Sequence, residues 1–278
     1  MTAAATGIFG IDHTIVGVRD LELARASYGR LGFTITPRGK HIGWGTANYC
    51  IMFQNDYVEL LGIVDATQFT NDLDKFLAQR EGLLGLAFGA PDNEIVKRAF
   101  DALGIASDGP KDLKRLLELP EGTAQPAFKL LFPSKEATPG LSAFVVQHLT
   151  PQLLRQNKWL HHANGAVGIA SVSVAADEPM RYAAAYKEIF GSGAVTVTPG
   201  TVTVATGGAR LIFSRDTMFR LPGVATPHMA SMSVLVPSVY LVARLLTGAG
   251  IVFESVGNDI VVPPDEAHGF YLVFEPVP

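Results

Sequence analysis

A pattern of one strand, one helix and three short strands occurs four times in this chain of 278 residues. In the first copy, "GIDHTIVGVRDLELARASYGRLGF" (10–33), an apolar strand precedes Asp20, a typical helix N-cap, and Gly32 ends the helix. The other strand–helix copies lie at 82–105, 168–191 and 229–251. Each is followed by strand-like runs between turn residues. The sequence therefore predicts four β-α-β-β-β units.

One such unit cannot cover both faces of its own four-stranded sheet. We therefore expect the units to pair into two eight-stranded open barrels, with helices outside and a cleft inside, in an α+β fold. The expected modules are 1–150 (units one and two) and 166–278 (units three and four), joined by a linker at 151–165. Residues 65–82 predict a connecting helix between the first two units.

Composition excludes several classes of protein. Hydrophobic residues make up 48% of the chain and charged residues 17%, which is typical of a compact globular protein. A net charge of −4 without any basic stripe argues against nucleic acid as a partner. The apolar stretch at 229–253 is interrupted by Pro237 and Arg244, so we expect no membrane span. With Cys50 as the only cysteine and no signal peptide at the amino terminus, a cytoplasmic location is expected.

Two polar residues stand out on apolar strands. His13 shares one face of the first strand with Ile15, and Glu59 in "YVELLGI" shares a face with Tyr57 and Leu61. A buried, unpaired carboxylate costs several kcal/mol, so Glu59 requires a cation, an arginine or a raised pKa. A histidine on such a strand is more often a hydrogen-bonded core residue than a ligand. From the residues alone, both a structural and a functional pair are consistent with the pattern.

The repeat resembles the vicinal oxygen chelate superfamily, which includes lactoylglutathione lyase, extradiol dioxygenases and bleomycin-resistance proteins. More narrowly, the chain resembles the glyoxalase-like domains of this superfamily. This similarity lies in "DHTIVGVRDLELARASYGRLGFTITPRGKHIGWGTANYCIMF", "YVELLGI" and "VVQHLTPQLLRQNKWLHHANGA" and covers about 11–166. The resemblance implies the paired fold described above. It also implies a divalent metal ion (zinc, nickel, manganese or iron) in the cleft, bound by the first and last strands of the units.

By this resemblance, His13 and Glu59 occupy metal-ligand positions. The matching positions of the second unit are Gly85, which has no side chain, and Gln147, a weak neutral ligand. His148 would complete the set only if a bulge turned it inward. The resemblance thus implies His13, Glu59 and Gln147 as metal ligands, with open positions for water or substrate.

Further candidates line the expected cleft. His41 lies on the second predicted strand and is either a proton-transfer and substrate-contacting group or a turn residue. His162 follows Trp159 in the linker, which could fold across the mouth of the cleft. The candidate catalytic residues are therefore Glu59 and His41, and the candidate substrate-binding residues are His41, Gln147, His148 and His162. In the second module the matching positions are Ser171, Phe213, Ser231 and Val273, which predict no comparable site.

Two functions are consistent with these observations. The first is a metal-dependent lyase, isomerase or dioxygenase that acts on a small substrate with neighbouring oxygen atoms. The second is a metal-free protein that binds and sequesters a small molecule. In both cases the expected partner is a small molecule, and a homodimer is possible.

Overall fold

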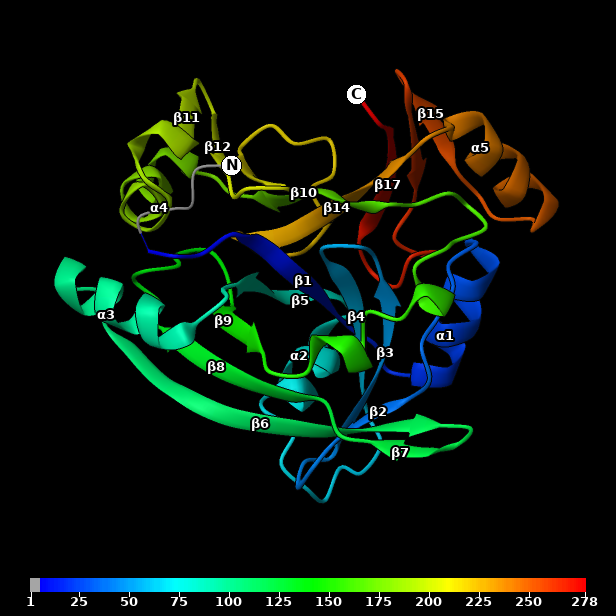
Figure 1. The fold of residues 1–278 in the computed structure, drawn as a ribbon. Helices are drawn as coiled ribbons and strands as arrows, with labels where there is room; N and C mark the ends of the chain where they lie inside the picture. Colours follow the sequence, from blue (N-terminus) through cyan, green and yellow to red (C-terminus); the bar gives the residue numbers. More distant parts are fainter. Residues whose placement is uncertain (1–5) are drawn as a thin grey trace.

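The computed structural model describes residues 6–278 and contains two β-sheets that pack on one another (Figure 1). Residues 1–5, which belong to the amino-terminal segment examined for a signal peptide, lie outside the described part. No helix within 6–278 combines the length and apolar character that a membrane crossing requires.

Each predicted unit forms a β-α-β-β-β element set, to which the second unit adds one further strand. The first unit comprises β1 (Gly10–Gly17), α1 (Leu21–Arg30), β2 (Gly39–His41), β3 (Thr46–Met52) and β4 (Tyr57–Ile63). After the connecting helix α2 (Leu73–Gln79), the second comprises β5 (Gly82–Gly89), α3 (Asn93–Leu103), β6 (Ser107–Leu119), β7 (Gly122–Ala124), β8 (Ala127–Pro133) and β9 (Ala143–His148). The third comprises β10 (Gly168–Ala175), α4 (Ala183–Phe190), β11 (Val195–Thr198), β12 (Thr201–Ala205) and β13 (Arg210–Ser214). The fourth comprises β14 (His228–Val236), α5 (Val239–Gly248), β15 (Glu254–Val256), β16 (Asp259–Val262) and β17 (Tyr271–Pro276). The predicted fold class is confirmed.

Short 3₁₀ helices connect several of these elements. Two of them, η1 (Pro151–Leu153) and η2 (Asn157–Trp159), lie between β9 and β10. The other two flank α4, with η3 (Pro179–Tyr182) before it and η4 (Ser192–Ala194) after it.

Local sequence signals account for the helix boundaries. The side chain of Asp20 accepts a hydrogen bond from the Leu23 amide at the start of α1, and Asp92 caps α3 in the same way through the Glu94 amide. Each cap satisfies one of the amides that a helix start leaves without an intrahelical partner. The strand–cap–helix order read from the sequence therefore forms as expected.

The first sheet has the strand order β2-β3-β4-β1-β5-β9-β8-β6-β7 and combines the first two units. An open barrel was expected, but β6 also pairs with β2 and closes the sheet. Closure is possible because β6 is 13 residues long and reaches beyond β8 to the far edge. The second sheet, β11-β12-β13-β10-β14-β17-β16-β15, contains no such edge pairing among the described residues.

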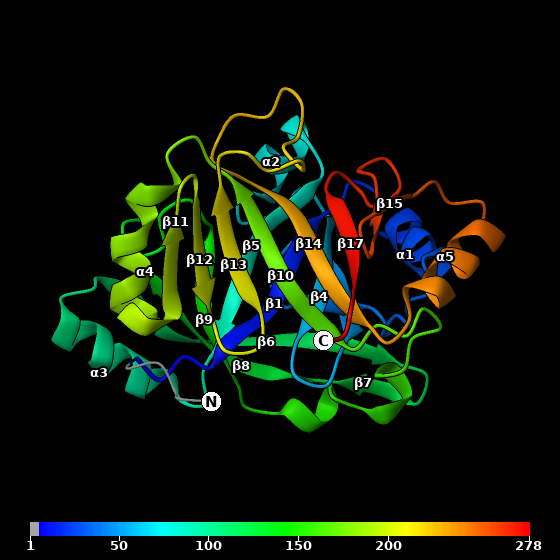
Figure 2. The same ribbon diagram turned by 90° about the horizontal axis from the view of Figure 1, so that it is seen from above.

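The two sheets pack through their convex faces, where β10 and β14 lie over β1 and β5 (Figure 2). Val16 of β1 and Val172 of β10 belong to the same buried apolar cluster, and the Thr14 hydroxyl contacts the Met232 sulfur at 3.1 Å. A smaller cluster that includes Met52 and Ala87 fills part of the interior of the first barrel. The interior of this barrel is therefore separated from the core between the sheets.

Replacing Gly207 with alanine tests the close approach of the two modules. Gly207 has φ +122°, and a Cβ atom there would lie 2.0 Å from the Phe9 carbonyl oxygen. Gly122 has φ +134°, and a Cβ atom added there would have no neighbour within 4 Å, so it is a matched control for the backbone strain alone. We expect Gly207→Ala to lower the free energy of unfolding by about 1–3 kcal/mol more than Gly122→Ala, measured by urea denaturation. Equal losses would contradict this close approach.

Candidate functional site

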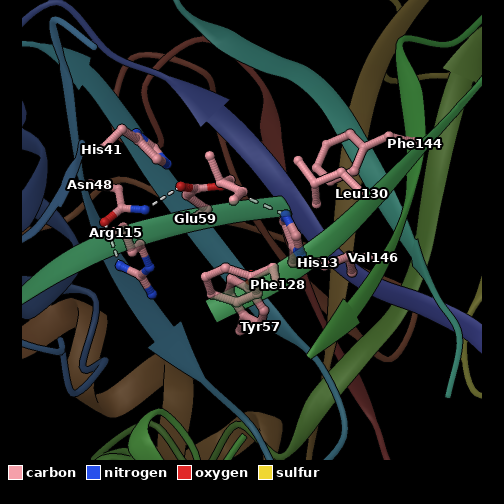
Figure 3. A pocket seen from close by; sticks show the side chains of 11 residues that line it. His13, His41, Asn48, Tyr57, Glu59, Arg115, Phe128, Leu130, Phe144 and Val146 are labelled. Carbon is pink, nitrogen blue, oxygen red and sulfur yellow. Dashed lines mark hydrogen bonds and ion pairs between the residues drawn. The ribbon is translucent and has the colours of Figure 1, made fainter. Parts of the chain in front are cut away.

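A cavity lies inside the closed first barrel (Figure 3). It encloses about 390 Å³ of empty space, which includes its mouth open to solvent. Its polar end is formed by His13, His41, Asn48, Glu59 and Arg115. The remaining wall is apolar and largely aromatic, formed by Tyr57, Leu113, Phe128, Leu130, Phe144 and Val146.

The structure brings His13 and Glu59 together. β1 and β4 are parallel neighbours, with His13 opposite Tyr57 and Ile15 opposite Glu59. The Nε2 atom of His13 lies 3.7 Å from Oε2 of Glu59 inside the cavity (Figure 3). The imidazole ring also stacks on Tyr57 at a centroid distance of 4.3 Å. Both side chains are almost fully buried.

Strand alternation predicts that the side chains of Asp12 and His13 lie on opposite faces of β1, but in the structure the two side chains are hydrogen-bonded to each other. The β1–β5 register shifts between Ile11 and His13, so Asp12 has no opposing residue on β5. Asp12 is completely buried, and its Oδ1 lies 2.8 Å from Nδ1 of His13. Burial opposes ionisation of this carboxyl, but hydrogen bonds from His13 and His148 outweigh it and lower its pKa. His13 is therefore held between two carboxylates.

Glu59 is held by a chain of polar side chains. Asn48 donates a hydrogen bond from Nδ2 to Oε1 of Glu59, and Nη1 of Arg115 donates to the Asn48 oxygen at 2.6 Å (Figure 3). Burial alone would raise the pKa of Glu59, but its interactions with His13, His41 and Arg115 and the Asn48 hydrogen bond together lower it. Glu59 is thus ionised at neutral pH.

Gly39 leaves room for this chain of polar side chains. A Cβ atom at Gly39 would lie 2.1 Å from both the Arg115 Nη1 atom and the Asn48 oxygen. Gly39 sits on β2 opposite Asn48 on one side and Leu117 on the other. Any larger residue there would displace the Arg115–Asn48 hydrogen bond.

His41 lines the cavity, as expected. Its Nδ1 atom lies 2.9 Å from the Thr46 hydroxyl, and burial lowers the pKa of the imidazole. A neutral His41 is therefore available for hydrogen bonding to a bound molecule.

Gln147 does not line the cavity, so its expected role as a metal ligand or substrate contact is wrong. Its side-chain oxygen accepts a hydrogen bond from the Asn93 amide at the start of α3, outside the barrel. The expected alignment of "YVELL" with "VVQHL" is out of register. In the structure Ala87 pairs with Phe144, as Ile15 pairs with Glu59, so the position equivalent to Glu59 is Phe144.

His148 and His162 also differ from expectation. His148 points to the same side of β9 as Val146, but it is bound to Asp12 at 3.0 Å and lies behind Phe128, outside the cavity lining. His162 accepts from the Thr34 amide through Nδ1 and donates to the Met52 carbonyl through Nε2, each at 3.0 Å. His162 therefore anchors the linker to the first unit and does not contact the cavity.

These positions limit what the cavity can bind. Catalytic metal sites use three protein ligands, and the expected set would need donors equivalent to His13 and Glu59 in the second unit. That unit supplies Gly85 and Phe144, which provide none. No group of three His, Cys, Asp or Glu side chains suited to a metal ion occurs within residues 6–278. The donors present do not fit a catalytic metal ion.

The second module has no equivalent polar cluster at the matching positions. Ser171 pairs with Ser233, and their hydroxyls are 2.9 Å apart. The strand register places Ile212, not Phe213, at the position equivalent to Glu59. These positions are filled by small hydroxyl and apolar side chains.

Arg115 and Asn48 were not among the sequence candidates. The alternation of Leu113, Arg115 and Leu117 contained a signal, since it puts the arginine on the same strand face as two leucines. That signal is weak because the surrounding segment is rich in charged residues, which is typical of a loop or an exposed edge.

The fold and cavity define a tandem β-α-β-β-β protein with a polar site in one barrel. A hypothetical protein from Staphylococcus aureus has the same fold (TM-score 0.70, 13% identity, covering 96% of this chain and 99% of that one). A mutant of 4-hydroxymandelate synthase from Streptomyces coelicolor is also similar (TM-score 0.60, 13% identity, 97% and 93% covered). A xylose isomerase-like TIM barrel/4-hydroxyphenylpyruvate dioxygenase fusion protein is similar as well (TM-score 0.57, 14% identity). That match covers 98% of this chain and 49% of the fusion protein. These identities show the fold alone.

The family assignment comes from the sequence match. Residues 11–190 match the glyoxalase-like domain family, which is more than half of the chain, so the protein belongs to that family. No curated protein matches the chain at a significant level.

Proposed function

We propose that this protein is an enzyme that transfers a proton next to the carbonyl group of a small, largely apolar molecule. The observation that carries the proposal is the pair formed by Nε2 of His13 and Oε2 of Glu59, 3.7 Å apart in the cavity. Proton transfer of this kind is the common step of isomerases, epimerases and many lyases. It requires a base, a group that stabilises the developing oxyanion, and exclusion of water.

His13 is the proposed general base. Its Nδ1 atom faces the carboxylate of Asp12, so Nε2 carries the lone pair that accepts the proton from carbon. Glu59 faces the same nitrogen and stabilises the imidazolium ion that forms. The two carboxylates are themselves near cations, Asp12 by Arg155 at 3.5 Å and Glu59 by Arg115.

Arg115 is the proposed electrophile. Its guanidinium is buried and lines the cavity, while one of its nitrogens is bound to Asn48 and another is 3.6 Å from the Cys50 sulfur. The N–H groups that remain can donate to a carbonyl oxygen and stabilise the enolate. In this step the C–H bond breaks and its proton moves to His13. The electron pair of that bond forms the enolate, which Arg115 binds, so the step is balanced.

The rest of the wall indicates the kind of substrate. Phe128, Phe144 and Tyr57 offer aromatic surface opposite the polar end (Figure 3). Such a wall favours an apolar or aromatic body attached to the carbonyl group. We therefore expect aryl alkyl ketones, arylacetaldehydes and 2-oxo acids with apolar side chains, all of which have a C–H bond next to the carbonyl group, to bind better than small hydrophilic carbonyl compounds.

Deuterium incorporation tests this function whatever the final product of the reaction is. The protein is incubated in D₂O with a panel of such carbonyl compounds, and loss of the α-C–H signal is followed by proton NMR. We expect His13→Ala to lower the exchange rate by about 10²–10⁴-fold, the usual contribution of a general base. His161→Ala is a matched control, because His161 is exposed and outside the cavity. Binding of panel members without any exchange above the His13→Ala rate would support a sequestering protein and contradict the enzyme.

Removal of divalent metal ions is expected to leave the exchange rate unchanged. The physical reason is that no three His, Cys, Asp or Glu side chains within residues 6–278 are grouped so that they could hold a metal ion. The measurement compares rates before and after EDTA treatment, with metal analysis of both samples. A rate lost with EDTA and restored by zinc, nickel, manganese or iron would instead make His13 and Glu59 metal ligands and overturn the metal-independent mechanism.

A further inference from the structure

We propose that Asp12 is a positioning residue that keeps Nδ1 of His13 protonated and so makes Nε2 the atom that exchanges a proton in the cavity. This inference rests on the proposed role of His13 as a base. Asp12 itself does not line the cavity.

The backbone places Asp12 for this task. Because the β1–β5 register shifts between Ile11 and His13, Asp12 is the extra residue on β1. Such bulges turn a side chain away from its alternating direction. The turn allows the carboxylate to reach the ring of the residue that follows it, which regular alternation would prevent.

Three side chains from different parts of the chain converge on this carboxylate. His13 Nδ1 is 2.8 Å and His148 Nε2 3.0 Å from Oδ1 of Asp12, and Nη2 of Arg155 is 3.5 Å from Oδ2. Arg155 also donates to the carbonyl oxygens of Phe53, Gln54 and Asn55, which fixes it at the turn between β3 and β4. Because His148 of β9 and Arg155 of the linker both bind the Asp12 carboxylate, it cannot rotate away from His13.

The charge state of Asp12 determines the tautomer of His13. The three donors that converge on the Asp12 carboxylate stabilise its ionised form. An ionised carboxylate only accepts hydrogen bonds, so Nδ1 of His13 must carry the proton. Stacking on Tyr57 then keeps the ring in the orientation that directs Nε2 toward Glu59.

His148 supplies a second hydrogen bond to Asp12. Its Nε2 atom lies 3.0 Å from Oδ1 of Asp12, whereas its Nδ1 atom is buried and has no hydrogen-bond partner among the described residues. The hydrogen bond to the carboxylate is therefore donated from Nε2.

NMR of the full chain labelled with ¹⁵N-histidine tests the inference directly. The seven histidines are distinguished by single His→Gln variants, starting with His13→Gln. In the wild-type protein we expect neutral His13 to be the Nδ1–H tautomer. In Asp12→Asn we expect His13 to be the Nε2–H tautomer, because the carboxamide can donate a hydrogen bond to Nδ1 of His13. We also expect the rate of deuterium exchange in this variant to be lower by about 10²–10⁴-fold, with an unchanged KM. His161 is the internal control, whose tautomer should not change.

An Nε2–H tautomer in wild-type His13, or an unchanged tautomer in folded Asp12→Asn, would overturn the inference. If circular dichroism shows that Asp12→Asn does not fold, the tautomer of His13 in the wild-type protein still tests the inference. In His148→Gln, His13 should keep its proton on Nδ1, because Asp12 is still present. The tautomer is measured without substrate. An expected tautomer combined with no exchange activity would therefore contradict the proposed function alone, whereas a wrong tautomer combined with measurable exchange would contradict the role of Asp12 and leave the proton-transfer activity standing.

Discussion

Arg115→Met is expected to lower the free energy of unfolding by about 3–5 kcal/mol, the usual cost of removing one partner from a buried set of charges. Arg115 is 3% exposed and Glu59 is 7% exposed. Without Arg115, the ionised Glu59 loses its nearby permanent cation, and the Asn48 oxygen loses its donor. Urea denaturation at neutral pH measures the change, and the same variant should show no exchange activity because the enolate is no longer stabilised.

Two further variants separate the charge effect from lost packing. Arg98→Met changes an exposed arginine on α3 and should alter the free energy of unfolding by less than about 0.5 kcal/mol. Glu59→Gln in the Arg115→Met background should recover part of the lost stability, because it removes the uncompensated charge. Additive losses in the double variant would show that Arg115 does not compensate Glu59.

Asp56→Asn is expected to stabilise the protein by about 2–4 kcal/mol at a pH of about 8 and to have little effect at about pH 4. Asp56 lies just before β4, and its Oδ1 accepts a hydrogen bond from the Ile169 amide at 3.0 Å, between the two modules. Burial raises the pKa of this carboxyl from 3.8 to about 7, in spite of the Ile169 hydrogen bond and the charge of Arg155. Asparagine keeps the acceptor and removes the charge.

The sign of the pH dependence follows from the raised pKa. Between about pH 4 and pH 7 the folded protein holds a proton on Asp56 that the unfolded chain has lost. The contribution of Asp56 to stability is therefore greatest below about pH 4 and is lost as the pH rises through about 7. Thermal or urea unfolding across this range should show a slope that Asp56→Asn removes. Asp216→Asn, an exposed control, should keep the slope, and a slope unaffected by Asp56→Asn would contradict the raised pKa.

Part of the candidate site could be predicted from the sequence. The alternation of β1 and β4 identified His13 and Glu59, and the family resemblance made their strands neighbours, which the structure shows. His41 was also placed correctly at the cavity. These predictions succeeded because each depends only on the parity of one regular strand and on the order of strands within one unit.

The predictions that failed depend on register between strands. Gln147 was aligned with Glu59 by sequence similarity, but the β5–β9 pairing puts Phe144 there and turns Gln147 outward to Asn93. A shift of one residue reverses which face a side chain occupies. The β-bulge at Asp12 reverses the expected face in the same way, and no pattern in a single sequence marks either event.

The sequence by itself determined the four β-α-β-β-β units, their helix caps and the buried His13 and Glu59, because periodicity and capping are local properties of the chain. Only the tertiary structure decided the closure of the first barrel by β6 and β2, the convergence of three donors on Asp12, and the placement of Arg115 beside Glu59. The hydrogen bonds from Arg115 to Asn48, from His148 to Asp12 and from Arg155 to Asp12 join residues that are 67, 136 and 143 positions apart. Such contacts arise from packing and the satisfaction of buried charges, which local sequence patterns do not encode.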